Sequence, residues 1–348
     1  MPKQKIAVLF GGHSTEYEVS LQSAYAVINH LDYDQYDSVL IGITREGEWY
    51  RYYGAYDKIL HDSWHSEGRC VRATLSPDRS VHGIIELHED GITETRIDAA
   101  FPVLHGRNGE DGTVQGLLEL AGIPVIGCGT LSSALCMDKD IAHKLVQASG
   151  IKVAPSITAS KADSIDSIMA MSRQLNYPLF VKPLRAGSSF GITMASNKPE
   201  LAEAIDIAFA HDDRIIIEQK IEGFEVGCAI LGSDELLIGE VDEIELSQGF
   251  FDYNEKYTLQ TSKVHMPARI DAGTAEWIKH TAAVIYKALR CKGFARVDLF
   301  LTPDGELVFN EVNTIPGFTA HSRYPNMMRG IGVSFEEIIE NLIRQAMK

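Results

Sequence analysis

Long apolar runs are missing from this chain of 348 residues, and no stretch approaches the roughly 20 apolar residues that a membrane-spanning helix needs. The N-terminus, Met-Pro-Lys-Gln-Lys, leads directly into a short strand-like run and lacks the apolar core of a signal peptide. Cysteine is scarce as well: the five residues are odd in number, scattered, and match no spacing typical of metal ligands. We therefore expect a cytoplasmic protein whose thiols are reduced.

Positively charged residues are also in the minority, with 32 Lys and Arg against 48 Asp and Glu and a formal net charge of −16 at pH 7. Such a balance argues against nucleic acid and anionic membrane surfaces as partners, because both repel an acidic protein. Local anion sites built from a few lysines remain compatible with it. The length allows two or three domains with substantial cores.

Hydrophobic periodicity divides the chain into three α/β units. In the first, strand-like runs alternate with helical patterns, which is typical of an open parallel sheet flanked by helices. We expect its strands at residues 5–10, 38–43, 99–104 and 124–126, its helices at 20–31 and 112–121, and an elaboration over 47–96.

The second unit is expected to have helices at 139–148, 163–175 and 198–210 and strands at 153–158, 179–182 and 215–218. The third is expected to have a strand at 225–231, a polar loop near 246–261, helices at 274–289 and 334–347, and a hairpin over 296–313. The domains are placed at 1–127, 128–219 and 220–348.

The predicted hairpin carries four polar side chains at strand spacing. If Asp304-Gly305 is the tip of a two-residue turn, Asp298 pairs with Glu311 and Arg296 with Asn313, and all four share one face. Two carboxylates directly opposite each other repel unless a cation lies between them. An oxygen set of Asp, Glu and Asn suits Mg²⁺ or Mn²⁺, completed by water and phosphate oxygens. The hairpin therefore predicts a metal-nucleotide platform, and the plain alternative is an exposed hairpin with solvated charges.

Two further segments suit a nucleotide. Lys182 follows a strand and precedes the Gly187-Ser188-Ser189 loop, whose backbone N–H groups can approach phosphate oxygens closely. It is not a Walker A motif, because the lysine precedes the glycines, and the alternative is an ordinary surface loop. Residues 218–221 and Glu225 lie where one unit leads into the next, a common position for a base and its ribose.

Two glycine-rich turns mark the first unit. Gly11-Gly12-His13-Ser14-Thr15-Glu16 can hold an anion on its main chain, and Glu16 offers a counter-charge for an ammonium group. The alternative is a plain strand-turn-helix in which Thr15 and Glu18 form a capping box. His105 begins a similar loop over residues 105–112, where a structural role is the alternative to a catalytic one.

Taken together, these segments resemble a known family. Lys182 with its loop, residues 218–225 and the Arg296 to Asn313 hairpin are similar to the ATP-grasp fold. Residues 11–16, 105–115, Met137-Asp138-Lys139, 252–257 and 313–317 resemble the D-alanine:D-alanine ligases, and they cover the chain in order. The resemblance implies an α/β protein with an ATP-grasp fold preceded by a Rossmann-like, open parallel-sheet N-terminal domain. It also implies a ligase of peptidoglycan precursor synthesis, in which ATP activates D-alanine as an acyl phosphate that a second D-amino acid attacks.

The resemblance further implies roles for individual residues. Mg²⁺ would be held by Asp298, Glu311 and Asn313, and ATP by Lys139, Lys182, Ser189, Glu218, Gln219, Ile221 and Glu225. Arg296 and the backbone N–H of Gly317 would stabilise the oxyanion, and Lys256 would reach the transferring phosphate. Glu16, Ser188 and Tyr257 would form a hydrogen-bonded triad, with a mobile loop over 251–257 closing on the intermediate. His105, Ser322 and Arg323 would contact the amino-acid substrates, and Glu16 would bind the first ammonium group.

The second substrate depends on Arg323, where D-alanine-adding ligases usually carry Leu or Met. An arginine can donate to a serine hydroxyl, so this position favours D-serine and places the chain closest to D-alanine:D-serine ligases of glycopeptide resistance. Lactate-forming relatives carry a histidine in the mobile loop, whereas this chain keeps Asp252-Tyr253 and Lys256-Tyr257. A housekeeping D-alanine:D-alanine ligase is the alternative, with Arg323 pointing to solvent. Another ATP-grasp enzyme, such as a carboxylase or purine-pathway enzyme, and a non-catalytic ATP-binding scaffold are the rival classes. A homodimer is the family's usual assembly.

Overall fold

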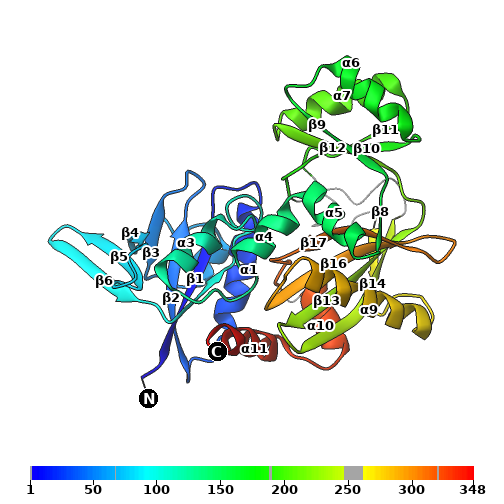
Figure 1. Cartoon of the computed structure of the whole chain (residues 1–348). Helices are drawn as coiled ribbons and strands as arrows, with labels where there is room; N and C mark the ends of the chain where they lie inside the picture. The colour runs from blue at the N-terminus through cyan, green and yellow to red at the C-terminus, as the bar shows by residue number, and fades with distance from the viewer. Residues whose placement is uncertain (1, 67, 188–189, 247–261, 320) are drawn as a thin grey trace.

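The computed structural model describes residues 2–66, 68–187, 190–246, 262–319 and 321–348. These residues form three β-sheets with helices packed against them (Figure 1). The predictions for Ser188, Ser189, Lys256 and Tyr257 lie outside the described residues. No helix within the described ranges has both the length and the apolarity that a bilayer span requires.

The N-terminal sheet has a parallel centre and an antiparallel extension. Strands β1 (Gln4–Gly11), β2 (Tyr36–Ile43) and β7 (Ala99–Pro102) are parallel, as predicted. The elaboration forms an antiparallel extension of this sheet, so the whole sheet is mixed; it consists of β3 (Trp49–Tyr52), β4 (Cys70–Leu75), β5 (Gly83–His88) and β6 (Gly91–Arg96). The predicted strand at 124–126 makes only an isolated bridge, Ala100 with Val125.

Side chains of β1 alternate between two cores because successive residues of a strand point to opposite faces. Val8 and its even-numbered neighbours pack with α1 (Tyr17–Asn29) and the C-terminal helix α11 (Phe335–Ala346). Leu9 and Ala7 pack with α3 (Thr113–Ala121) on the other face. The last helix of the chain therefore completes the core of the first domain and ties the two ends of the sequence together (Figure 1). The short helix α2 (Asp57–Leu60) lies beside α1.

A four-stranded antiparallel sheet forms the central lobe. Its order is β11-β10-β12-β9, with β9 (Ser156–Ser160), β10 (Leu179–Pro183), β11 (Thr193–Ala195) and β12 (Arg214–Gln219). Its apolar face packs against α6 (Ile165–Met171) and α7 (Lys198–Phe209), and the 3₁₀ turn η1 (Ser172–Gln174) follows α6. The predicted strand 153–158 is split at Pro155, which lacks an N–H, so β8 (Lys152–Val153) joins the third sheet instead.

The third sheet has six strands in the order β15-β14-β13-β16-β17-β8. It contains β13 (Phe224–Gly232), β14 (Leu236–Leu246), β15 (Ser262–His265), β16 (Phe294–Leu301) and β17 (Leu307–Asn313). One face packs on α5 (Lys139–Ala148) and α9 (Ala272–Ala288), and α10 (Arg323–Gly330) packs on β13 and β14. Helix α4 (Thr130–Met137) leads from the first domain into α5.

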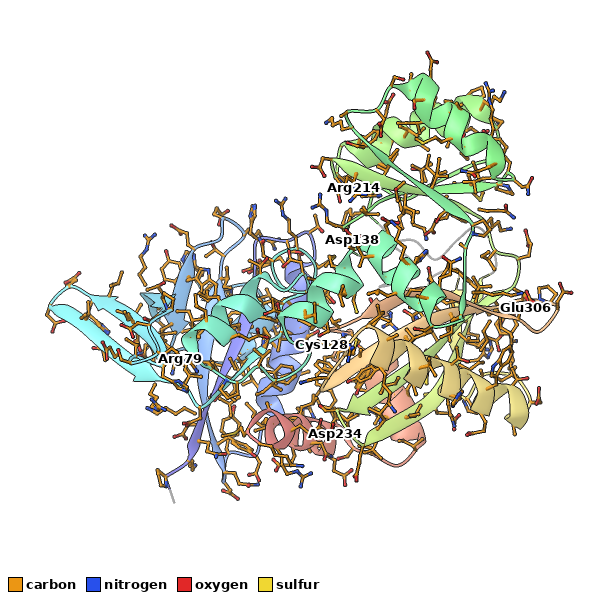
Figure 2. All side chains as sticks on the ribbon, viewed as in Figure 1. Arg79, Cys128, Asp138, Arg214, Asp234 and Glu306 are labelled. Atoms are coloured by element: carbon orange, nitrogen blue, oxygen red, sulfur yellow. The ribbon has the colours of Figure 1, made fainter. Side chains whose placement is uncertain are left out.

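Two of the junctions between the lobes can be followed in Figure 2. Cys128 lies between the first domain and the six-stranded sheet, with its Sγ 3.3 Å from the carbonyl oxygen of Lys292. Asp138 caps α5 by accepting a hydrogen bond from the Ile141 backbone, and Arg214 of β12 reaches Asp140 on the same helix at 3.9 Å. Helix α5 thus connects the central lobe to the six-stranded sheet.

Candidate active site

The β16–β17 hairpin has the predicted pairing but not the predicted turn. Arg296 pairs with Asn313 and Asp298 with Glu311. The tip is a three-residue loop, because Thr302 and Glu306 pair across it and Gly305 adopts φ +80°. One residue is then inserted at Asn310, where the register shifts by one. A one-residue slip would put Glu311 and Asn313 on the opposite face, so this β-bulge gives the hairpin its shared polar face.

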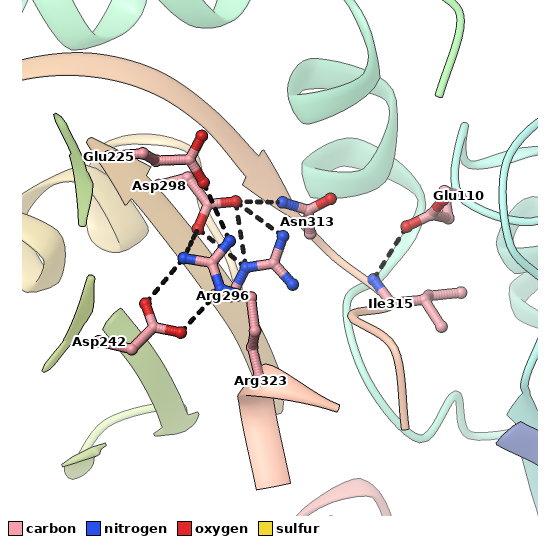
Figure 3. A network of polar contacts seen from close by, with 8 residues as sticks. All are labelled: Glu110, Glu225, Asp242, Arg296, Asp298, Asn313, Ile315 and Arg323. Atoms are coloured by element: carbon pink, nitrogen blue, oxygen red, sulfur yellow. Dashed lines mark hydrogen bonds and ion pairs between the residues drawn. The ribbon is translucent and has the colours of Figure 1, made fainter. Parts of the chain in front are cut away.

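Arg296 and Asp298 form a buried ion pair on this face (Figure 3). Arg296 Nε lies 2.8 Å from Asp298 Oδ1, and Nη2 lies 2.7 Å from Oδ2. Asn313 Nδ2 donates to the same Oδ2 at 2.9 Å. Burial alone would raise the pKa of Asp298, but the guanidinium groups of Arg296 and Arg323 outweigh it and hold that pKa below its ordinary value.

Arg323 at the start of α10 points into the same network. Its Nε and Nη2 each donate to Asp242 of β14 at 2.7 Å, and its Nη1 donates to Glu225 at 2.9 Å. Nη2 also lies 3.4 Å from Asp298 Oδ1. Only 11% of the Arg323 side chain is exposed, so the alternative in which it points to solvent is wrong.

The charge balance of this cluster suits a divalent cation. Two guanidinium groups and the ammonium group of Lys182 lie among five carboxylates, those of Glu218, Glu225, Asp242, Asp298 and Glu311, so acidic groups are in excess. Among the described residues no group of three His, Cys, Asp or Glu side chains is arranged as a metal site, and the predicted set has only two carboxylates with one amide. Mg²⁺ often binds through one or two carboxylates and takes its other ligands from water and phosphate, so this donor set fits it.

The predicted nucleotide residues lie between the central lobe and the six-stranded sheet. Lys182 Nζ is 2.5 Å from Glu218 Oε2 across neighbouring strands. Burial would lower the pKa of Lys182, but the carboxylates of Glu218, Glu311 and Glu225 outweigh it and raise that pKa. Lys139 Nζ donates to the carbonyl of Ala186 at 2.9 Å, at the start of the glycine-serine loop. Lys182 thus stays protonated near the acidic cluster.

Gln219 and Ile221 are less directly engaged. The Gln219 side chain accepts a hydrogen bond from the Asn176 backbone at 3.2 Å. Ile221 lies two residues after the end of β12 and is partly exposed. Their backbone groups lie at the crossing from the central lobe to the six-stranded sheet, where a base was predicted.

Glu16 lies where the first domain meets the phosphate loop. It is buried, and a Cβ built on Gly106 or on Gly187 would lie 2.4 or 2.5 Å from its Oε2. The carboxylate therefore fits between two glycines from distant parts of the sequence. The capping-box alternative is wrong, since Glu16 is the N-cap of α1 and no side chain caps it.

A second loop, residues 313–317, is anchored to the first domain. Glu110 accepts hydrogen bonds from the backbone N–H of Gly106 at 2.7 Å and of Ile315 at 3.3 Å. Burial and then the nearby charge of Glu16 raise the pKa of Glu110 to about 8. Gly317 lies two residues after Ile315 on this loop.

His105 is buried against the same loop. Its Nε2 is 3.0 Å from Ser23 Oγ, which also accepts from the Phe318 backbone N–H at 3.3 Å. Burial lowers the pKa of His105 to about 4, against the raising effect of a hydrogen bond to the Ile315 backbone. Ser322 Oγ is engaged nearby with Thr319, whose backbone N–H donates to it at 3.0 Å. His105 is therefore neutral at pH 7.

Comparisons with known proteins agree with this geometry. Family models described as the N-terminus and the C-terminus of D-ala D-ala ligase match residues 5–128 and 145–344. The chain belongs to the D-alanine:D-alanine ligase family. It is 44% identical to a D-alanine–D-alanine ligase of Caldicellulosiruptor bescii, over all of this chain and 96% of that protein. It is 42% identical to the vancomycin B-type resistance protein VanB of Enterococcus faecalis, over the whole of both chains.

Solved structures give the same family. The VanG D-Ala:D-Ser ligase from Enterococcus faecalis matches with a TM-score of 0.93 and 57% identity, over 99% of this chain and 100% of that one. The predicted fold, an α/β ATP-grasp ligase with a Rossmann-like N-terminal domain, is thereby confirmed. The domain boundaries stay a prediction.

Three residues of this ligase-family site were not predicted. Asp242 lies on a strand whose acidic sequence reads as polar, Glu110 was noted only as part of a glycine-rich loop, and His143 was noted only as part of a helix. The signal available was weak: acids at alternate positions from Glu240 to Asp242, and a histidine four residues after Lys139 on the same helix face.

Proposed function

We propose that this chain joins D-alanine to D-serine at the expense of ATP, through a D-alanyl phosphate, and so makes a peptidoglycan precursor of the glycopeptide-resistance type. The observation that carries the choice of D-serine is the buried Arg323, held by Asp242 beside the metal hairpin. The similarity to the D-Ala:D-Ser ligase VanG supports the same choice.

In the first step, a carboxylate oxygen of D-alanine attacks the γ-phosphorus of ATP, a P–O bond forms, and ADP leaves. Glu16 binds the ammonium group of this D-alanine, and the neutral His105 adds no positive charge that would repel it. Lys139 and Lys182 neutralise the phosphates. A Mg²⁺ or Mn²⁺ ion bound by Asp298, Glu311 and Asn313 would supply further neutralisation of phosphate charge.

The base and ribose would lie between the two ATP-grasp sheets, against Glu218, Gln219, Ile221 and Glu225. Glu218 would keep Lys182 oriented, since the two are already paired. Ser188, Ser189, Lys256 and Tyr257 lie outside the described residues, and their roles in the triad, in phosphate binding and in loop closure rest on the family resemblance.

In the second step, the amine of the second substrate attacks the acyl carbon, a C–N bond forms, inorganic phosphate leaves and the amine gives up a proton. The oxyanion of the tetrahedral intermediate would be stabilised by Arg296 and the Gly317 N–H. Arg296 Nε and Nη2 are used by Asp298, and Nη1 has no hydrogen-bond partner among the described residues. Nη1 is therefore available to an oxyanion.

Arg323 would read the hydroxyl of D-serine. A guanidinium group offers five N–H donors, and four of them face Asp242, Glu225 and Asp298. The second N–H of Nη1 has no hydrogen-bond partner in the described part of the chain, so one donor is left for a hydroxyl. A methyl group in the same place would leave that donor unpaired.

A housekeeping D-alanine:D-alanine ligase is the second candidate, and the relative from Caldicellulosiruptor bescii favours it. Family membership removes the support for a carboxylase or purine-pathway enzyme. The presence of Arg296 and all three predicted metal ligands argues against a non-catalytic scaffold. A cytoplasmic location, a homodimer, and the absence of nucleic-acid and membrane partners stay predictions.

The deciding experiment is phosphate release with ATP and Mg²⁺, with products identified by mass. We expect D-alanyl-D-serine to dominate when D-alanine and D-serine are both supplied, and little D-alanyl-D-lactate with D-lactate. D-alanyl-D-alanine as the main product in excess D-serine would instead establish the housekeeping function. A reaction without ATP, and one with EDTA, are the controls for the energy source and the metal.

A further inference from the structure

His143 lies at the meeting point of three elements that the proposed site needs. It is on α5, four residues after Lys139, so both side chains project from one face of the helix. It is 6% exposed. Its ring packs edge-on against Phe309 of β17, with centroids 5.5 Å apart. No role is predicted for this residue from the sequence.

The contact that matters is with the bulge of the metal hairpin. His143 Nε2 lies 3.2 Å from the carbonyl oxygen of Asn310, the inserted residue of β17. A carbonyl only accepts, so Nε2 carries the proton and donates. The same Nε2 lies 3.7 Å from Glu218 Oε1 on β12. One imidazole therefore touches the strand that carries the predicted metal ligands and the strand that carries the predicted nucleotide carboxylate.

A bulge needs such support because the inserted residue leaves the ladder unpaired at that point. Loss of the bulge would shift the pairing register of Glu311 and Asn313, which follow Asn310 on the same strand. A side-chain donor from a helix behind the sheet is one way to satisfy the exposed carbonyl. The remaining ring nitrogen, Nδ1, has no hydrogen-bond partner among the described residues, so the Asn310 contact is what orients the ring.

We propose that His143 is a positioning residue for the metal-bearing strand: its Nε2–H fixes the carbonyl of Asn310 and so keeps Glu311 and Asn313 on the face that carries Asp298. The inference rests on the proposed function for the metal role of these side chains, but the contact with the bulge stands by itself. His143 acts through the backbone of β17.

Two amide substitutions of His143 differ in side-chain length but carry the same polar group, so they show whether the position of the N–H donor matters. His143→Gln places an amide N–H near the position of Nε2, whereas His143→Asn carries the same amide one carbon short of it. His143→Leu removes the donor at similar volume. His280→Leu, at an exposed position of α9, is the matched control for loss of a histidine.

The first measurement is hydrogen exchange by mass spectrometry on the ligand-free protein. We expect exchange across residues 307–313 to rise about 5-fold in His143→Asn and His143→Leu, the worth of one net hydrogen bond, and to stay near wild type in His143→Gln. Residues 224–232 of β13 and the His280→Leu variant should show no change. Unaltered exchange over 307–313 in the folded His143→Asn variant would overturn the proposal, and this comparison decides it even if His143→Leu does not fold.

The second measurement is ADP binding by calorimetry with and without Mn²⁺. We expect the Mn²⁺-dependent part of the affinity to fall about 10-fold in His143→Asn and to be restored in His143→Gln, as for other residues that support metal ligands. Raised exchange with unchanged Mn²⁺ dependence would overturn the link to the metal. If wild type shows no Mn²⁺-dependent ADP binding, the proposed function fails instead, and the exchange result still decides the role of His143 at the bulge.

Discussion

Two acidic clusters in the described part of the chain contain carboxyl groups whose pKa values shift in opposite directions. On the hairpin, Asp298 receives hydrogen bonds from Arg296 and Asn313 and faces Arg323, and its pKa is held below the ordinary value. In the first domain, Glu110 is partly buried near Glu16, the hydrogen bonds that it receives from described residues come from backbone N–H groups, and its pKa rises to about 8. Desolvation thus leaves one carboxyl group ionised and favours the protonated form of the other, depending on whether a cation is built in.

The difference bears on what each place can bind. A divalent cation entering the hairpin site must share Asp298 with guanidinium groups that are already there. These groups neutralise part of the carboxylate charge, and the metal is needed only for the negative charge that remains. In the first-domain cluster, the carboxyl groups of Glu16 and Glu110 lie close enough for their charges to repel, and a bound ammonium group would offset this repulsion directly. We infer that the hairpin suits charged phosphates and the first domain suits the amino acid.

Removing the built-in cation of the hairpin should have the largest effect. In Arg296→Ala we expect turnover to fall by about 100- to 1,000-fold, because an oxyanion donor in a buried site is lost. ADP binding should survive, since Lys182 and Lys139 are untouched. Steady-state kinetics and calorimetry measure the two effects. The control is Arg329→Ala at an exposed position of α10, and near-normal turnover in Arg296→Ala would remove the oxyanion role.

Removing the second guanidinium should change selectivity more than rate. In Arg323→Leu we expect the ratio of kcat/KM for D-serine over D-alanine to fall about 10- to 100-fold, the worth of one hydrogen bond from a charged donor. Three carboxylates lose a partner, so thermal stability should also fall. The ratio is measured within one preparation and does not depend on the active fraction. An unchanged ratio would mean that Arg323 does not read the hydroxyl.

The same contrast explains what the sequence predicted and what it missed. The hairpin pairing was predictable because register follows from a local count along one stretch of chain. Even so, two local features cancelled: the loop over Pro303-Asp304-Gly305 is one residue longer than expected, and the bulge at Asn310 restores the register. The parallel centre of the first sheet was predictable because buried parallel strands are apolar on both faces.

The partners of the site residues were not predictable, because they come from segments distant in sequence. Asp242 meets Arg323 across 81 positions, and Ile315 meets Glu110 across 205. No local periodicity encodes such pairs. The strand β14 was also not predicted, because its acidic residues resemble those of a polar loop. In the structure these acids form ion pairs: Glu240 with Lys279, Asp242 with Arg323, and Glu243 with Arg269.

Adding a side-chain atom next to Glu16, in the first-domain cluster of Glu16 and Glu110, should have a smaller effect, limited to substrate binding. In Gly187→Ala the new Cβ would lie 2.5 Å from Glu16 Oε2, so the carboxylate must move away from its place beside Gly106. We expect the KM for the first D-alanine to rise roughly 5-fold, as for one weakened polar contact, with little change in kcat. Gly116→Ala on α3, where a Cβ would meet only ordinary contacts, is the control. Equal kinetics for the two variants would show that Glu16 is not held by this fit.

The smallest effect concerns the titration of Glu110, and it sharpens the contrast most directly. Because its pKa rises from 4.5 to about 8 on folding, the folded protein binds more protons than the unfolded chain between those values. Its contribution to stability is therefore complete below pH 4.5 and is lost as the pH rises toward 8. Glu110→Gln cannot titrate at this position. The difference in Tm between the variant and wild type should therefore shift in favour of the variant by a few °C as the pH rises from 4.5 to 8. A pH-independent cost of the amide would not alter this shift. Glu203→Gln on the exposed face of α7 should run parallel to wild type. If Glu110→Gln also runs parallel, the first-domain cluster contains a counter-charge, and the contrast with the hairpin is lost.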